Sequence, residues 1–293
     1  MGYRKTLPWL IALAFFTTAC SGASGTDPAT AATADGSSSA SEEQNKALVL
    51  RLYSEAFNQD KTDVVRELVG ADYVQHDNSV SGGADGQVKQ FQDLKAKIPG
   101  AVATVKRTAA DRDLVAVHWH ASATPADEAT GEAKVDLYRV ANGKLVEHWS
   151  ITQTVPATTA SGNSLFSDVY QYPNGAPTLS EEQEETNREF AVTAYRKLSD
   201  GDAAVIDTSW DPRYYQHNPA AGNGTGPLKQ FMQQQGVTLP SGTTGSGGTQ
   251  FGHTLADGDL VWVFSSDYVV ADIFRVVDGK IIEHWDVVAD GQQ

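Results

Sequence analysis

Apolar residues recur with a helical period near the start of each half of the chain. In the first half they follow the i, i+3, i+4, i+7, i+8 spacing of a helix with one buried face, at Val49, Leu52, Tyr53, Ala56 and Phe57. In the second half the spacing returns at Ala191, Ala194, Tyr195 and Leu198. The motif Ser-Glu-Glu-Gln precedes each stretch, at 41–44 and 180–183, and suits a capping box. We therefore expect a helix to begin at each motif.

The pattern then changes from helices to strands. After further helical stretches near residues 63–69 and 87–97, β-branched and aromatic residues dominate 114–121, 135–141 and 144–152. The dipeptide Asn142-Gly143 separates the last two strands, and Asp278-Gly279 takes the same place in the second half. Both dipeptides are typical of tight hairpin turns. Helices followed by antiparallel strands predict an α+β fold.

The chain contains an internal repeat. Four blocks occur twice in the same order: Tyr-x-Gln-His at 73–76 and 214–217, Lys-Gln-Phe at 89–91 and 229–231, Asp-x-x-Arg-Val at 136–140 and 272–276, and Glu-His-Trp at 147–149 and 283–285. The offset drifts from 141 to 136 residues, which indicates duplication with small changes in loop length. We expect one domain over 42–166, a linker over 167–179 and a second domain over 180–293.

The N-terminal segment has the features of an export signal. Arg4 and Lys5 precede an apolar run over 7–16, which is shorter than the roughly 20 residues needed to span a bilayer. Small residues then lead to Cys20, the only cysteine. We expect a lipoprotein-type signal peptide over 1–20 and a lipid anchor at Cys20 on the outer face of a bacterial membrane. Secretion after ordinary cleavage is the alternative. The small polar residues of 21–41 predict a disordered tether.

Charge and composition exclude one class of partner. The chain has 37 acidic and 22 basic residues and a net charge of −15, so it offers no basic face for a phosphate backbone. Hydrophobic residues make up 40% of the chain, enough for two packed cores. We expect a soluble acidic surface and no binding of nucleic acid.

The repeated blocks resemble a known family. Tyr-x-Gln-His, then Asp-hydrophobic-aromatic-Arg, then Asp/Asn-Gly-Lys followed by Glu-His-Trp are similar to the SnoaL-like polyketide cyclases of the nuclear transport factor 2-like superfamily. The resemblance implies cone-shaped domains, in which helices and a curved antiparallel sheet enclose a pocket, with no metal and no organic cofactor. It also implies that Asp136 and Asp272 occupy the position of the catalytic aspartate.

An aspartate in an apolar pocket could act as a base. Burial disfavours the charged carboxylate and raises its pKa, which suits removal of a proton from a carbon beside a carbonyl. A histidine near the carbonyl oxygen would stabilise the enolate. A structural aspartate held by hydrogen bonds is the alternative for Asp136.

The hairpin turn predicts which residues of the two strands pair, and therefore which side chains share a face of the sheet. If Ala141 pairs with Lys144 and the ladder is regular, Asp136, Tyr138, Glu147 and Trp149 share one face and His148 lies on the other. The same count groups Asp272 with Phe274, Glu283 and Trp285, and separates it from His284. We therefore interpret Tyr138, Glu147, Trp149, Phe274, Glu283 and Trp285 as ligand-binding candidates, and His148 and His284 as structural.

Four other histidines are candidates for the site. His76 and His217 end the Tyr-x-Gln-His blocks and are expected in the pocket, with a capping or core role as the alternative. His118 and His120 lie on one strand face, where His120 is expected beside Asp136 and His118 among the ligand-binding residues. A metal site is disfavoured because Thr124 and Pro125 stand where a cupin-type site needs an acidic residue. The second copy has Phe264 and Ser266 in place of the pair, so the first copy is the better candidate for chemistry.

Two functions are compatible with these features. One is a cofactor-free acid/base enzyme of the aldol, cyclase or isomerase type, acting on an apolar carbonyl compound. The other is a non-catalytic cell-surface module that binds a small hydrophobic ligand or a protein partner. In either case we expect the two domains to form an intramolecular pseudo-dimer through the outer faces of their sheets.

Overall fold

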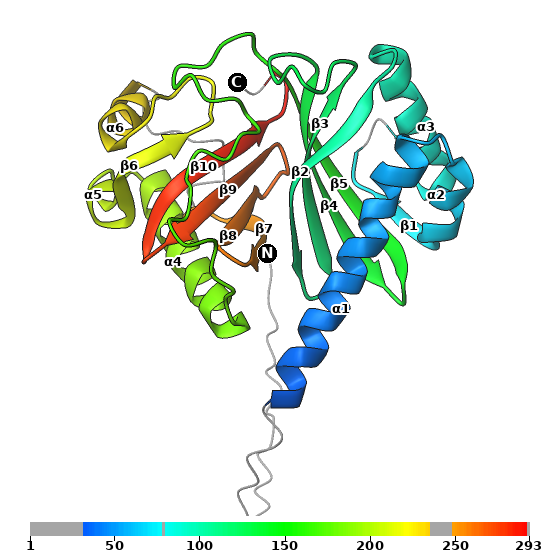
Figure 1. Cartoon of the computed structure of the whole chain (residues 1–293), viewed down its shortest axis with the longest axis horizontal. Coiled ribbons are helices and arrows are strands. Elements are labelled where there is room, and N and C mark those ends of the chain that lie inside the picture. Colours follow the sequence, from blue (N-terminus) through cyan, green and yellow to red (C-terminus); the bar gives the residue numbers. More distant parts are fainter. Residues whose placement is uncertain (1–31, 78–79, 235–247, 292–293) are drawn as a thin grey trace, which may run out of the picture.

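A computed structural model describes residues 32–77, 80–234 and 248–291 (Figure 1). The expected signal peptide and Cys20 lie outside the described residues. In the described part of the chain, no helix is long and apolar enough to cross a membrane. The first half contains α1 (Ala32–Arg51), the π-helical segment η1 (Leu52–Phe57), α2 (Thr62–Leu68), β1 (Val69–Gln75), α3 (Gly83–Lys97), β2 (Val102–Asp111), β3 (Leu114–Ser122), β4 (Glu132–Ala141) and β5 (Lys144–Thr154).

The second half repeats this order of elements. It contains α4 (Glu181–Ser199), α5 (Val205–Ser209), β6 (Trp210–Gln216), α6 (Thr225–Gln234), β7 (Phe251–Asp257), β8 (Leu260–Ser265), β9 (Val270–Val277) and β10 (Lys280–Val288). The strand orders β1-β5-β4-β3-β2 and β6-β10-β9-β8-β7 are the same. The α+β fold is therefore confirmed, with one five-stranded sheet in each half. Each sheet is antiparallel except at one edge, where β1 and β6 run parallel to β5 and β10.

The starts of the two long N-terminal helices differ. The capping box forms at α4, where the Ser180 side chain accepts from the Gln183 backbone and the Gln183 side chain accepts from the Ser180 backbone. The expected start at Ser41 is wrong, because α1 begins at Ala32 and passes through that motif. Its backbone groups there are already paired within the helix, so no cap is needed. Residues 32–41 are thus helical rather than a disordered tether.

A β-bulge in the last strand of each sheet changes the expected register. The turn itself is as predicted, with φ of 53° at Asn142 and 68° at Gly143, and Ala141 pairs with Lys144. However, Val140 pairs with Leu145 and Arg139 with Glu147, so Val146 is an extra residue. The same shift in β10 leaves Ile282 extra. Every side chain beyond the bulge therefore faces the opposite way from the regular-ladder prediction.

Each sheet has an inner face under its own helices and an outer face toward the other sheet (Figure 1). The inner faces carry separate apolar clusters, one containing Tyr53, Trp119 and Tyr138, the other containing Trp210 and Phe274. The outer faces share a third cluster, in which Trp149 and Phe166 lie with Trp262 and Trp285 and with Leu, Ile, Val and Ala side chains from both halves. The two domains thus pack sheet against sheet over one common core.

The segment that joins the domains is fixed by charged groups. Asp168 accepts from Arg275 at 2.9 Å and forms an ion pair with Arg107 at 3.4 Å. The Arg107 guanidinium lies 3.9 Å from the ring centroid of Trp285, which places a cation from domain 1 on an aromatic face of domain 2. Burial lowers the pKa of Arg107 to about 10. The linker, Arg107 and strand β9 are therefore held as one unit.

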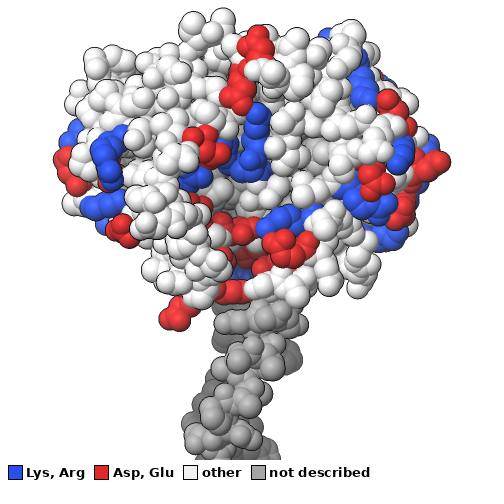
Figure 2. Space-filling view, in the orientation of Figure 1, with Lys and Arg blue, Asp and Glu red and all other residues white. Residues whose placement is uncertain are grey.

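Charged side chains also gather along the seam between the two lobes (Figure 2). Lys46 of α1 forms an ion pair with Asp257 of β7 in the other domain at 2.8 Å, and Glu184 of α4 accepts from the Gly258 backbone at 2.8 Å. Burial raises the pKa of Glu184 to about 7, and the charges of Asp257, Glu181 and Glu42 act in the same direction. This junction therefore carries a carboxyl group that titrates near neutral pH.

Glu184→Gln should alter how stability depends on pH. The pKa of Glu184 is raised from 4.5 to about 7 in the folded chain. Between pH 4.5 and about 7, the folded chain therefore keeps a proton on Glu184 that the unfolded chain has already released. The wild-type free energy of unfolding should therefore fall, relative to the variant, as pH rises from about 4.5 to about 7. Denaturant unfolding across this range measures the difference, with Glu189→Gln on the exposed side of α4 as the charge control. A difference that is constant with pH would contradict the assignment.

Candidate functional site

Asp136 is the centre of a buried polar network inside domain 1. One oxygen, Oδ2, accepts from the Tyr53 hydroxyl at 2.8 Å and from the Trp119 indole at 2.7 Å. The other, Oδ1, lies 3.1 Å from Nε2 of His148. The Asp136 residue is 2% exposed. The carboxylate is thus held by donors from a helical segment and two strands.

These contacts make the Asp136 carboxylate a stable anion. Burial acts to raise its pKa, but the hydrogen bond from His148, the charge of Lys134 and the hydrogen bond from Ser150 outweigh that effect and lower the pKa below its usual value. The expectation of a raised pKa is therefore wrong for this arrangement, because the aspartate lies among donors rather than in an apolar environment.

A glutamine fixes the orientation of the neighbouring imidazole. The Gln75 side chain accepts from the Asp77 backbone through Oε1 at 3.3 Å, which turns its Nε2 toward Nδ1 of His148 at 2.8 Å. An amide nitrogen donates, so Nδ1 of His148 accepts and the ring proton sits on Nε2, facing Asp136. The neutral imidazole is thus a hydrogen-bond donor to the carboxylate.

Two tyrosines complete the network in domain 1. Tyr53 comes from the π-helical segment η1, a local distortion that is frequent at functional sites. The Tyr138 ring stacks on His148 with centroids 4.4 Å apart, and its hydroxyl is 3.4 Å from that of Tyr53. Burial raises the pKa of both hydroxyls well above its usual value, and the charge of Asp136 acts in the same direction. Both tyrosines are therefore neutral donors.

Domain 2 keeps the Asp–His pair but changes its surroundings. Nε2 of His284 lies 2.9 Å from Oδ1 of Asp272, and the Phe274 ring stacks on His284 at 4.8 Å. Asp286 pairs with Asp272 across the two strands, where domain 1 pairs Ser150 with Asp136. Burial raises the pKa of Asp286 to about 6. The second domain thus buries two carboxyl groups where the first buries one.

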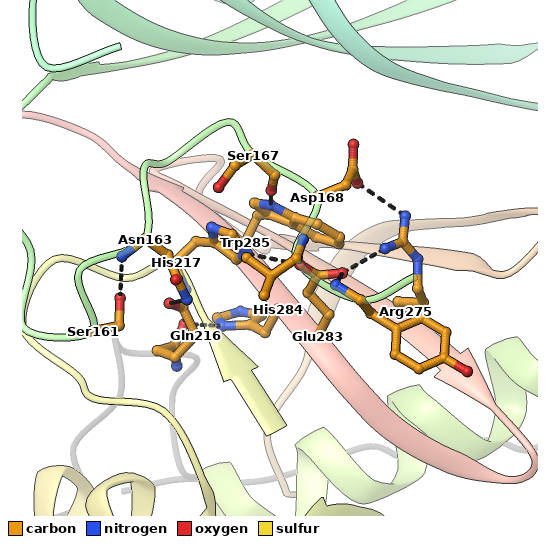
Figure 3. A network of polar contacts seen from close by, with 12 residues as sticks. Ser161, Asn163, Ser167, Asp168, Gln216, His217, Arg275, Glu283, His284 and Trp285 are labelled. Carbon is orange, nitrogen blue, oxygen red and sulfur yellow. Dashed lines mark hydrogen bonds and ion pairs between the residues drawn. The ribbon is translucent and has the colours of Figure 1, made fainter. Parts of the chain in front are cut away.

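The histidines expected in the pocket lie on the outer faces instead. His76 is exposed and stacks on Trp149 at 4.2 Å. His118 and His120 alternate with Trp119, which points inward, so they face the other way, against Phe166. His217 lies 3.0 Å from Glu283 and stacks on Trp285 (Figure 3). The prediction that these four histidines share a face with the aspartates is wrong.

The bulge also moves four of the predicted ligand-binding side chains. Trp149 and Trp285 lie in the cluster shared by the domains, and Glu147 pairs with Arg139 at 3.0 Å. Glu283 accepts from the Val169 backbone at 2.6 Å and pairs with Arg275, which ties the linker to β10. None of the four faces the interior: the two tryptophans lie between the domains, Glu283 holds the linker, and Glu147 pairs within the sheet of domain 1. Tyr138 and Phe274 are on the inner face, as predicted.

The residues that contact the aspartates are not those that a regular ladder predicts. His148 and His284 were interpreted as structural, although the Glu-His-Trp repeat contained them, because one extra residue in β5 and β10 reverses their direction. The change from Ser150 to Asp286, directly after that repeat, was also a visible signal. Tyr53 and Gln75 had no signal beyond their places in the helical pattern and the Tyr-x-Gln-His block.

Each half is thus an α+β domain with helices over the inner face of its sheet and a buried Asp–His pair. Residues 47–160 match the family model described as SnoaL-like polyketide cyclase, and the match lies within the first domain. No curated protein matches the chain.

Several solved structures are similar to one domain's length of the chain. IdmH of Streptomyces antibioticus, described as a candidate polyketide cyclase, is 28% identical, with 38% of this chain and 95% of that chain covered and a TM-score of 0.32. A SnoaL-like polyketide cyclase candidate from Jannaschia sp. CCS1 is 23% identical, with 38% and 87% covered and a TM-score of 0.32. AclR of Streptomyces galilaeus, a candidate hydroxylase, is 22% identical, with 39% and 82% covered and a TM-score of 0.33.

Tyr53→Phe should destabilise the protein more than an exposed substitution nearby. The change removes a donor from the buried, charged Asp136 carboxylate, and a hydrogen bond to a charged group contributes about 1.5–3 kcal/mol. Urea unfolding of the full chain should show a loss of that order. Ser54→Ala, on the exposed side of the same segment, should stay within about 0.5 kcal/mol of wild type. Equal effects of the two substitutions would show that the Tyr53 hydrogen bond adds nothing.

Proposed function

We propose that domain 1 is a cofactor-free acid/base enzyme for a small apolar carbonyl compound, with Asp136 as the proton acceptor. The observation that carries this proposal is the Asp136 carboxylate with His148 on one oxygen and Tyr53 on the other, inside the SnoaL-like domain. The reaction type is aldol, cyclase or isomerase-like, because each begins with removal of a proton from a carbon next to a carbonyl.

The geometry suggests a role for each side chain in the proton transfer. A substrate carbonyl that accepts from the Tyr53 hydroxyl takes a donor away from Asp136, which raises the basicity of Oδ2. Oδ2 then takes the proton from the carbon beside the carbonyl, and the tyrosine hydroxyl stabilises the enolate oxygen. Throughout, His148 holds Oδ1 and keeps the carboxylate in place. His76, His118, His120 and His217 have no part in this step.

A second candidate function has its own observation. The low pKa of Asp136 and the full set of donors around it also suit a rigid polar core in a binding module that performs no chemistry. Such a module would bind a small hydrophobic ligand or a protein partner. The two functions differ in whether the Asp136 carboxylate is needed for turnover.

We further propose that the protein acts outside the cytoplasm, anchored by a lipid on Cys20. The charged, apolar and small segments of residues 4–19 support export, and the position of the single cysteine supports lipidation. Cys20→Ser should move the protein from the membrane fraction to the soluble fraction. Equal membrane association of this variant would contradict the anchor.

Proton abstraction can be measured without the natural substrate. We expect the wild type to accelerate exchange of the α-hydrogens of 2-tetralone, a small apolar ketone, in D2O, followed by NMR. Asp136→Asn should reduce the enzymatic rate by about 10²–10⁴-fold, because the amide cannot accept the proton. Asp272→Asn reports separately on domain 2. Exchange that survives both substitutions would rule out the aspartates as the base, and ketone binding without exchange would favour the binding module.

A further inference from the structure

The inner face of domain 2 brings together three groups that bind metal ions. Asp272 on β9 lies opposite Asp286 on β10, and His284 is two residues before Asp286 on the same strand. Because alternate residues share a face, all three side chains point inward. One ligand atom from each lies within 4.8 Å of the others, and all three residues are buried. Two buried carboxylates opposite each other repel unless a proton or a cation lies between them.

The second carboxylate lacks a partner for one of its oxygens. Oδ2 of Asp286 accepts from the Asn218 amide at 2.6 Å, whereas Oδ1 is buried with no hydrogen-bond partner. Asp286 is 6% exposed. Among the described residues, neither Asp272 nor Asp286 forms an ion pair with a lysine or arginine. An unpaired buried carboxylate oxygen is costly, so its position calls for a ligand.

The orientation of His284 points to the same conclusion. Oε1 of Gln216 accepts from the backbone groups of His217 and Asn218, both at 2.9 Å, which fixes it as the oxygen. The same Oε1 lies 2.9 Å from Nδ1 of His284, so Nδ1 carries the proton. Nε2 is then the ring atom that faces Oδ1 of Asp272, at 2.9 Å. Two acceptors at 2.9 Å need a positive charge or a proton between them.

Domain 1 provides the contrast. There Gln75 presents its nitrogen to the ring, so Nε2 of His148 carries the proton and donates to Asp136. Ser150 takes the place of Asp286, so domain 1 has one carboxylate and an imidazole donor already matched to it. The flipped glutamine and the added carboxylate are therefore two separate changes in domain 2, and both favour a bound cation.

We propose that Asp272, His284 and Asp286 form a binding site for a divalent transition-metal ion in domain 2. Two carboxylates and one imidazole suit Zn²⁺, Co²⁺, Mn²⁺ or Fe²⁺, whereas Ca²⁺ prefers an all-oxygen site. Metal–ligand distances of about 2.0–2.2 Å place neighbouring ligand atoms roughly 3–3.5 Å apart, and Nε2 of His284 and Oδ1 of Asp272 are already 2.9 Å apart. Gln216 holds the ligating histidine by its Nδ1 proton, the usual outer contact of a metal-bound imidazole.

Cobalt titration of the full chain tests the site directly. After treatment with a chelator, the wild type should bind one equivalent of Co²⁺, with visible absorption bands that Zn²⁺ abolishes by competition. Asp286→Asn, which preserves shape but not charge, and Asp286→Ser, which copies domain 1, should each weaken binding at least 100-fold. Asp136→Asn, the matched change in domain 1, should leave the Co²⁺ affinity and the single equivalent unchanged.

Each result decides the proposal. Failure of the wild type to bind Co²⁺, Zn²⁺ or Mn²⁺ at millimolar concentration overturns it, as does equal Co²⁺ affinity in Asp286→Asn or loss of binding in Asp136→Asn. If an Asp286 variant does not fold, metal uptake and a rise in the melting temperature of the wild type with Zn²⁺ still test the site. The readout is metal binding rather than turnover, so it is independent of the acid/base chemistry proposed for domain 1.

Discussion

One extra residue in the last strand of each sheet determines what the interior of each domain contains. Val146 and Ile282 shift the ladder by one position, so that the histidine of each Glu-His-Trp repeat points inward and the flanking glutamate and tryptophan point outward. The inward histidine meets the aspartate of the neighbouring strand. The outward tryptophans belong to the core that the two domains share. The polar site and the domain interface therefore depend on the same backbone irregularity.

Much of the fold follows from the sequence, because it depends on patterns that local physics enforces. Helical spacing, strand composition and the Asn-Gly and Asp-Gly turns predicted the elements to within a few residues in most cases. The site was less predictable. A bulge leaves no sequence signal as strong as a turn does, and a one-residue shift reverses every assignment beyond it. Asp136 and Tyr138 share the inner face as predicted, because β4 contains no extra residue, whereas His148 and Trp149 exchange faces because they follow the extra residue of β5.

The two copies show how a duplicated framework can diverge without a change of fold. Both keep the strand order, the bulge, the glutamine beside the histidine and the Asp–His pair. They differ in the direction of that glutamine and in Ser150 against Asp286. These are changes of hydrogen-bond direction and of charge, which alter chemistry far more than packing. A comparison of hydrophobic patterns alone would treat the copies as equivalent.

The common core between the sheets also bears on how the chain folds as it emerges. Trp149 and Phe166 belong to the first half of the chain, but Trp262 and Trp285 of the same cluster come more than 90 residues later. Until the second half is made, the first has an uncovered apolar face, which is prone to association with other chains. The outer face of the first sheet is therefore buried only after the second half of the chain has been made. A truncated first domain would leave this apolar face exposed, as a folding intermediate does.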